Sequence, residues 1–245
     1  MIIKNKIINI YNIFIRIIII NMKDDLELID IDQDIDPEYC FKLVILGDSG
    51  VGKTSLVKYE INNSFINNSD STVVFEHSFK NFSIFKKIVR LNIWDTCGQE
   101  VYHSSIKNFY KSALCIIIVF SLESIESFNN IEGWIKEIKN NNYEDPIIVL
   151  IGNKSDLSET RIISKELIEE CSIKNEIEYY FEASAKTGEN VHEIFKNVVK
   201  QLFIKFAMPN LIKTKEKETP SPFRKNNFFK EKANNLCNMC FCYNQ

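Results

Sequence analysis

The run Gly47–Thr54 contains three glycines, a lysine and a threonine at the spacing of a phosphate-binding loop. The run is Gly-Asp-Ser-Gly-Val-Gly-Lys-Thr, directly after the apolar residues 41–46 and before a helical pattern. Glycines let successive backbone N–H groups turn toward phosphate oxygens, and the start of a helix adds its dipole. Lys53 would reach the β- and γ-phosphates, and the Thr54 hydroxyl would ligate Mg²⁺. The alternative, a chance glycine turn, does not account for the full match.

A second feature is the acid that follows the strand-like residues 88–93. Asp95 stands at the end of this run, where the Mg²⁺ shell of a bound nucleotide requires a carboxylate, usually through water. The predicted metal ligands are therefore Thr54 and Asp95, on two different elements.

Two further motifs predict which base is bound. Asn153-Lys154-Ser155-Asp156 follows the buried-strand pattern 146–152. The Asp156 carboxylate can accept hydrogen bonds from N1–H and the 2-amino group of guanine, whereas adenine would leave this acceptor unpaired. The run 182–186, which contains Ser184, Ala185 and Lys186, completes the base pocket after the strand-like residues 176–181. Together the motifs predict a guanine nucleotide.

The four motifs, in this order, resemble the Ras superfamily of small GTPases and, within it, the Rab family. The resemblance covers residues 39–206 and includes the run Ser127–Trp134. Thr72 stands where this family has its switch I threonine, and Phe65 where it has an aromatic residue that packs on guanine. An ordinary core phenylalanine is the alternative for Phe65.

The resemblance implies a role for each matching residue. Thr72 would bind Mg²⁺ and the γ-phosphate, the Gly98 N–H would hold that phosphate, and Gln99 would orient the attacking water. The implied catalytic residues are Gln99, Lys53 and Thr72, and the implied Mg²⁺ ligands are Thr54, Thr72 and Asp95. The implied nucleotide-binding residues are Asp48, Ser49, Gly50, Val51, Gly52, Lys53, Thr54, Ser55, Phe65, Thr72, Gly98, Asn153, Lys154, Asp156, Ser184, Ala185 and Lys186.

These motifs contain no arginine that could act as a built-in finger, so we expect hydrolysis to be slow without an activating protein. The resemblance thus implies a GTP/GDP switch that recruits effectors to membranes in vesicle trafficking. It also implies an exchange factor and an activating protein as partners, with no role for nucleic acid.

Four residues depart from the Rab pattern around the switch loops, namely Val74, His77, Cys97 and Val101. They leave open a second function, a GTP-locked interaction module with negligible hydrolysis. A P-loop kinase or ATPase is a third class, but it has no use for the Asn-Lys-Ser-Asp motif.

Composition and periodicity predict one α/β domain with tails. The chain has 245 residues, is 45% hydrophobic and carries a net charge of −3. The predicted fold is a doubly wound, mainly parallel six-stranded sheet with helices on both faces, over residues 40–206. One helix is expected from about Ser124 to Ile138 and another over 191–203, where Asn190 and Glu193 suggest a capping box.

The segment 1–39 is expected to be a disordered extension, rich in Ile and Asn and then acidic. Its apolar stretch is interrupted by Asn and Arg, which disfavours a signal peptide or a membrane span. We interpret Met22 as the possible true start.

The segment 207–245 is expected to be a flexible, basic tail that ends in a cysteine motif. Cys240 and Cys242 resemble the paired prenylation site of Rabs, and two lipids anchor a protein stably. A zinc site for the tail cysteines is the alternative, but it lacks a fourth ligand. The expected location is the cytoplasmic face of intracellular membranes or the plasma membrane, with a soluble cytosolic pool.

Overall fold

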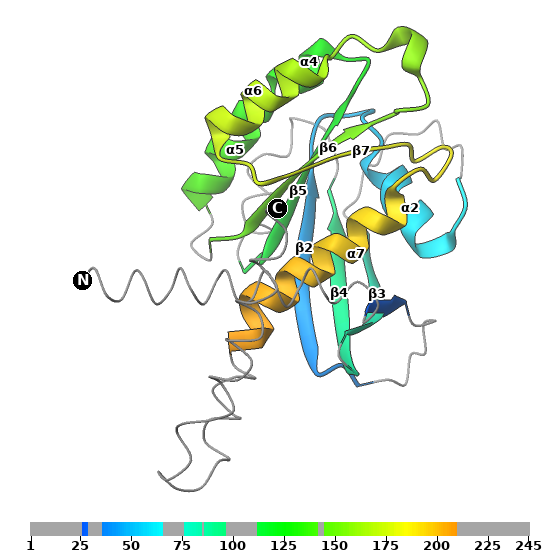
Figure 1. Cartoon of the computed structure of the whole chain (residues 1–245), viewed down its shortest axis with the longest axis vertical. Helices are drawn as coiled ribbons and strands as arrows, with labels where there is room; N and C mark the ends of the chain where they lie inside the picture. Colours follow the sequence, from blue (N-terminus) through cyan, green and yellow to red (C-terminus); the bar gives the residue numbers. More distant parts are fainter. Residues whose placement is uncertain are drawn as a thin grey trace, which may run out of the picture. The chain divides into compact units, whose positions relative to one another are not determined.

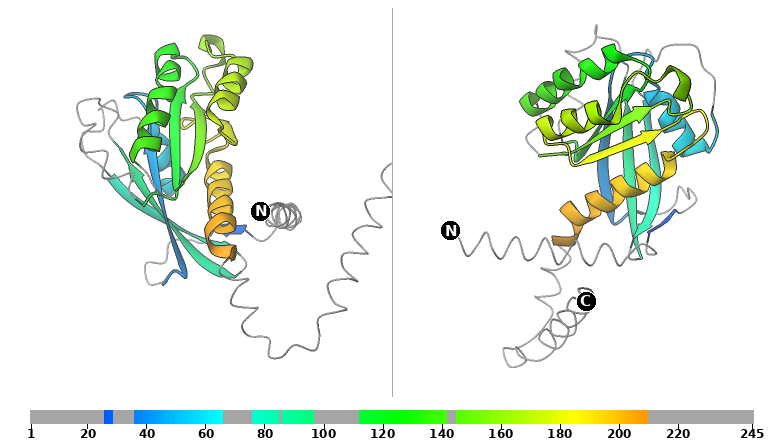
Figure 2. Two further views of the ribbon diagram at one scale, coloured as in Figure 1. Left: turned by 90° about the vertical axis from the view of Figure 1, so that its left-hand side faces the viewer. Right: turned by 45° about the horizontal axis from the view of Figure 1, so that its top comes forward.

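The structure is a computed structural model that describes residues 36–65, 76–84, 86–96, 112–141 and 145–209, and the backbone of 26–28. The described residues up to Ala207 belong to one compact unit, in which helices cover a central sheet (Figures 1 and 2). The predicted residues Thr72, Gly98, Gln99, Cys240 and Cys242 lie outside the described ranges. No helix within those ranges is long and apolar enough to cross a bilayer.

The six predicted strands are present and form a mostly parallel sheet, as expected. They are β2 (Tyr39–Leu46), β3 (Glu76–Ile84), β4 (Lys87–Asp95), β5 (Cys115–Ser121), β6 (Ile147–Asn153) and β7 (Tyr179–Ala183). Their order is β3-β4-β2-β5-β6-β7, in which only the β3–β4 pair is antiparallel. β5 is buried along its whole length, because helices cover both faces of a doubly wound sheet.

A seventh strand extends this sheet at the β3 edge. β1 (Leu26–Leu28) pairs antiparallel with β3, with Leu26 opposite Ile84 and Leu28 opposite Phe82. These three residues belong to the segment that we expected to be disordered, so the structure differs from that expectation here.

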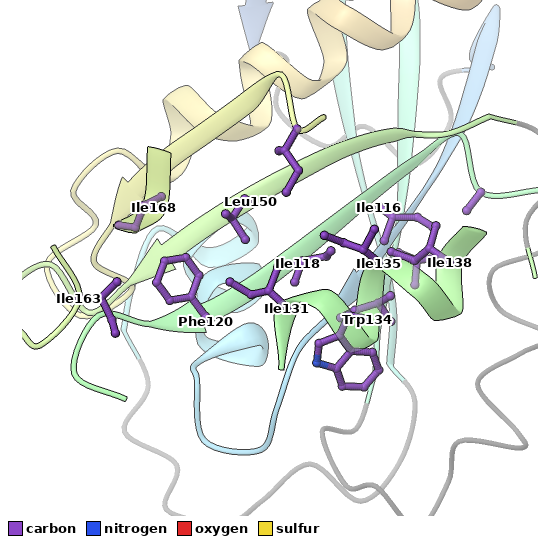
Figure 3. Close-up of a cluster of buried hydrophobic side chains, with 14 of the residues drawn as sticks. Ile116, Ile118, Phe120, Ile131, Trp134, Ile135, Ile138, Leu150, Ile163 and Ile168 are labelled. Carbon is purple, nitrogen blue, oxygen red and sulfur yellow. The ribbon is translucent and has the colours of Figure 1, made fainter. Parts of the chain in front are cut away.

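Helices α4 (Ile125–Asn129), α5 (Ile131–Asn141) and α6 (Lys165–Asn175) follow the strands β5 and β6. A buried apolar cluster joins them to one face of the sheet, and Figure 3 shows Ile131, Trp134 and Ile135 of α5 beside Ile118 and Phe120 of β5. Ile163 and Ile168, before and within α6, belong to the same cluster. This cluster fixes the helices that flank the loops of the candidate site.

Helix α2 (Lys53–Asn62) packs against α7 (Val191–Leu202), which crosses β2 and β4 in Figure 1. The expected helix over 191–203 is confirmed, and its apolar stripe is buried. It continues as the π-helical turn η3 (Phe203–Ala207). The expected capping box is wrong, because Asn190 has a left-handed backbone and its side chain instead donates to the Glu182 carbonyl at 2.9 Å.

The helix expected from Ser124 to Ile138 is two helices that meet at Asn130. The Ser124 hydroxyl accepts from the Ser127 N–H and caps α4. Asn130 is the single turn residue between them, but its backbone stays in the helical region, at φ −76° and ψ −9°, so the apolar stripe continues through the junction. Periodicity therefore predicted the buried face but not the break.

Candidate functional site

The motifs predicted to bind a nucleotide lie at one edge of the sheet. Parallel strands β2, β4, β5, β6 and β7 all end at this edge, and a functional loop follows four of them. In such sheets ligands bind outside the carboxyl ends of the strands. The fold therefore brings together the run after Leu46, Asp95, and the loops after Asn153 and Ala183.

The loop between β2 and α2 requires glycine at two places. Gly47 has φ +138°, and a Cβ there would lie 2.1 Å from the Val119 carbonyl oxygen. Gly52, the last residue before α2, has φ +96°, and a Cβ there would lie 2.3 Å from Asn153 Nδ2. Both values are in the left-handed region that side chains disfavour. The loop is thus held against β5 and against the end of β6.

The buried lysine of this loop folds back over it. Lys53 is 5% exposed, and its Nζ donates to the carbonyls of Gly47 at 2.8 Å and Asp48 at 2.7 Å. Ser49 and Gly50 are exposed, while Val51 is buried and Ser55 half-buried on the first turn of α2. An ammonium held by loop carbonyls at a helix start is suited to anionic phosphate groups.

A hydroxyl and a carboxylate meet beside this loop. Thr54 Oγ1 donates to Asp95 Oδ2 at 2.5 Å, and Asp95 is 2% exposed. Burial raises the pKa of Asp95 to about 6, although the Thr54 hydrogen bond and the Lys53 charge oppose the rise. The neighbouring Thr96 hydroxyl fixes the end of β4 by donating to the Ile45 carbonyl at 2.7 Å.

These oxygens fit a hard divalent cation. Asp95 Oδ1 is buried and has no hydrogen-bond partner within the described part of the chain. Its Oδ2 accepts from the Thr54 hydroxyl, a group that can itself be a ligand of Mg²⁺. A buried acid with one unpaired oxygen next to a threonine hydroxyl is the donor set that Mg²⁺ prefers.

Asn153 connects the predicted base loops to the phosphate loop. It is 1% exposed, its Nδ2 donates to the Val51 carbonyl at 2.8 Å, and its Oδ1 accepts from the Ala185 N–H at 3.1 Å. One side chain therefore fixes three loops relative to each other. Sequence reasoning placed Asn153 in the base site, and the structure gives it this wider bracing role.

Asp156 is oriented by the loop that follows β7. Its Oδ1 accepts from the Ser184 hydroxyl at 2.6 Å, and its Oδ2 lies 4.0 Å from Lys186 Nζ. The Ser184 hydroxyl also accepts from the Thr187 N–H at 3.1 Å, so its proton points to Asp156. The Ser155 N–H donates to the Ala183 carbonyl at 3.0 Å. A carboxylate held in this way can accept the adjacent donors of guanine.

Lys154 and Phe65 were also predicted to contact the nucleotide. Lys154 has φ +68°, and its Nζ forms an ion pair with Glu123 Oε1 at 2.6 Å, which places it over the loop after β5. Phe65 is 38% exposed beyond the end of α2. Its predicted contact with a base stays a prediction.

Sequence reasoning missed the arginine that braces the base loops. Arg161 donates from both Nη atoms to the two carboxylate oxygens of Glu182, each at 2.8 Å, and from Nε to the Ile163 carbonyl at 2.7 Å. Glu182 directly precedes the buried Ala183 and Ser184. The bidentate pair thus ties the segment after Asp156 to the second base loop, and no local pattern around Arg161 indicates this.

Sequence reasoning also missed two residues that hold the phosphate loop from outside. The Asp48 carboxylate accepts from Asn130 Nδ2 at 2.7 Å and from Trp134 Nε1 at 3.0 Å. Trp134 looks like an ordinary core residue in the apolar stripe of α5, so the stripe itself conceals the polar contact.

The fold and this site define a class, that of P-loop proteins which bind a guanine nucleotide at the carboxyl edge of a doubly wound sheet. The chain belongs to the Ras family, whose model matches residues 42–204, and is Rab-like within it.

Several curated relatives support this assignment. The chain is 38% identical over 166 residues to Ras-related protein Rab-11B of Dictyostelium discoideum, which covers 68% of this chain and 75% of that protein. It is 35% identical over 168 residues to RABA1h of Arabidopsis thaliana, covering 69% and 77%. It is 34% identical over 171 residues to the GTP-binding protein ypt3 of Schizosaccharomyces pombe, covering 70% and 79%.

Proposed function

We propose that this chain is a Rab-like GTP/GDP switch that hydrolyses bound GTP slowly and, in its GTP form, recruits effectors to membranes in vesicle trafficking. The observation that carries the proposal is the bracing by Asn153, which holds the phosphate loop and the second base loop together. Such bracing suits a protein that keeps one nucleotide bound for a long time. The Rab-named relatives support the trafficking role.

In this proposal the residues divide the work between binding and hydrolysis. Lys53 and the loop N–H groups bind the phosphates, and Asp156 selects guanine. Thr54, Asp95 and Thr72 would hold Mg²⁺, which neutralises phosphate charge when it is bound. Gln99 would orient the attacking water, and Gly98 the γ-phosphate. All of these residues lie within the domain bounds of 40–206 that we propose.

Hydrolysis is tested with the full chain loaded with γ-labelled GTP, in single-turnover mode, with Gln99→Leu alongside. Release of label at about 10⁻⁴–10⁻³ per second, lost in the variant, is the expected result. If neither protein releases label while both retain GTP, the chain is a GTP-locked module, and Val74, Cys97 and Val101 become the residues to explain.

Base selection is tested by Asp156→Asn, with the exposed Asp145→Asn as a control. The amide can donate to the carbonyl that xanthine has in place of the guanine amino group, so binding should move from GDP toward XDP. An unchanged preference for GDP in Asp156→Asn would refute the assignment of the base site.

Membrane attachment is proposed through lipids on Cys240 and Cys242. A full-length Cys240→Ser, Cys242→Ser variant should move from the membrane fraction to the soluble fraction of cells, whereas Cys171→Ser should not. Equal sedimentation of the double variant and the unchanged protein would defeat this part of the proposal.

A further inference from the structure

The Asp48 carboxylate accepts hydrogen bonds from two donors that lie one helical turn apart. Asn130 Nδ2 lies 2.7 Å from Oδ2, and Trp134 Nε1 lies 3.0 Å from Oδ1. The two donor residues are joined through the helix itself, because the Trp134 N–H donates to the Asn130 carbonyl at 3.2 Å. Residues four apart lie on the same helix face, so the two donors form a fork that matches the two carboxylate oxygens.

The backbone of the same residue reaches the lysine of the phosphate loop. The Asp48 carbonyl accepts from Lys53 Nζ at 2.7 Å. On its other side is Gly47, which lies so close to Val119 that no Cβ fits there. The contact of Gly47 with β5 and the side-chain fork together therefore set the position of the Asp48 peptide. This peptide carries one of the carbonyls that hold the Lys53 ammonium.

The Trp134 donor of the fork is held by close packing in the core. Trp134 is 8% exposed and packs in the apolar cluster beneath α5, together with Ile131, Ile135 and Ile138 (Figure 3, indole nitrogen in blue). A well-packed interior transmits a displacement instead of absorbing it. The core of this face therefore fixes where the indole N–H is.

We propose that Asp48 is a positioning residue of the phosphate loop, through which Asn130 and Trp134 set the place of the Lys53 ammonium against the β-phosphate. The inference rests on the proposed function, since it needs a nucleotide in the loop. It adds a physical route by which the junction of α4 and α5 governs how long that nucleotide stays.

The test is the rate at which the full chain, loaded with fluorescent GDP and Mg²⁺, releases it. Trp134→Phe keeps an aromatic side chain of smaller size and removes the N–H donor, and Asn130→Ala removes the other donor at a half-exposed position. Each should release GDP roughly tenfold faster, the effect of one hydrogen bond to a charged group. Matched controls are Ile138→Val, which changes packing in the same helix, and the exposed Asn129→Ala; both should behave as the unchanged protein.

A second measurement separates positioning from loosened structure. In ³¹P spectra of bound GDP, the β-phosphorus resonance should move in Trp134→Phe and Asn130→Ala, while the α-phosphorus resonance stays, because Lys53 is placed at the β-phosphate. Asp48→Ala removes the acceptor of the Trp134 N–H, so combining it with Trp134→Phe should accelerate release by less than the product of the two single effects, because both changes break the same contact.

The outcomes separate a failure of the proposed function from a failure of the positioning role of Asp48. If the unchanged protein does not retain GDP, the proposed function fails. If it retains GDP but Trp134→Phe and Asn130→Ala match their controls in both rate and spectrum, the positioning role of Asp48 is overturned and the proposed function stands.

Discussion

The Thr54 hydroxyl and the Asp95 carboxylate are joined by a hydrogen bond of 2.5 Å, which connects the first turn of α2 to the last residue of β4. The bond satisfies Oδ2 of the buried Asp95 carboxylate, while its Oδ1 has no hydrogen-bond partner in the described part of the chain. These two residues therefore have a structural role without a cation, beside the ligand role that we propose for them with Mg²⁺.

Thr54→Ala separates these two roles. In nucleotide-free protein it leaves a buried carboxylate without its donor, so we expect the free energy of unfolding to fall by about 1–3 kcal/mol. In the GDP complex it removes the hydroxyl that we propose as a Mg²⁺ ligand, so addition of EDTA should no longer accelerate GDP release. The measurements are urea unfolding and GDP release with and without EDTA. The exposed Thr160→Ala is the control; a Thr54→Ala protein that still responds fully to EDTA would contradict the ligand role.

Glu60 is a fully buried acid between two basic residues. Its Oε1 lies 3.0 Å from Lys80 Nζ, and its Oε2 lies 2.6 Å from His192 Nδ1. The Lys80 side chain is itself 7% exposed, and its ammonium also donates to the Glu60 carbonyl. The contacts join α2, β3 and α7 on the face away from α5.

Glu60→Gln should therefore be among the most destabilising changes in the chain. It leaves the Lys80 charge buried without a counter-charge, which costs about 3–5 kcal/mol when one partner of a buried pair is removed. Chemical denaturation at neutral pH measures this, with the exposed Glu170→Gln as the matched control. A loss below about 1 kcal/mol would mean that water reaches Lys80.

The Arg161–Glu182 pair predicts a pH dependence. Hydrogen bonds from Arg161 lower the pKa of the Glu182 carboxyl below its ordinary value of 4.5. The unfolded chain then binds this proton more readily than the folded one, so the pair stabilises the fold above pH 4.5 and loses this effect as the pH falls through the lower, folded pKa.

Glu182→Gln should therefore flatten the acid limb of the stability curve. Unfolding free energies of the two proteins should differ most near neutral pH and converge below about pH 4. Urea unfolding over this pH range measures the effect, with the exposed Glu178→Gln as a control. A constant difference at all pH values would show that the substitution acts through packing alone.

Two glycines should respond to alanine in opposite ways. Gly133 lies within α5 with open space around its Cβ position, so Gly133→Ala should raise the free energy of unfolding by about 0.5–1 kcal/mol. Gly52→Ala would place a Cβ 2.3 Å from Asn153 Nδ2 on a left-handed backbone, so it should weaken GDP binding by at least an order of magnitude. Thermal unfolding and GDP titration test the pair. Normal GDP affinity in Gly52→Ala would show that the loop can rearrange.

The sequence was most informative where a residue type is required by local chemistry. The structure has the phosphate-loop glycines between β2 and α2, and Asp95 and Asn153 at the ends of β4 and β6, as predicted, because each motif needs only its own strand and loop. Their contacts with a nucleotide stay predictions. The six-strand core followed from the alternation of apolar runs.

What sequence reasoning could not give were contacts between distant segments. Asp48 meets Trp134 across 86 residues and Asn153 meets Val51 across 102, and neither residue's neighbours reveal the partner. The break between α4 and α5 at Asn130 was not predicted, because the Asn130 backbone stays nearly helical and the buried apolar stripe continues through it. Asn190 was misjudged because its side chain had a competing acceptor, the Glu182 carbonyl on β7.

The three-residue pairing of β1 with β3 has a consequence for the outer edge of the sheet. An open strand edge offers unpaired N–H and C=O groups on which another chain can add a strand, in self-association or in capture of an extended peptide. Here Leu26–Leu28 already occupies that position opposite Phe82–Ile84. Any chain that added a strand to this stretch of β3 would first have to displace Leu26–Leu28. An incoming strand therefore competes with a segment of the protein itself for this edge.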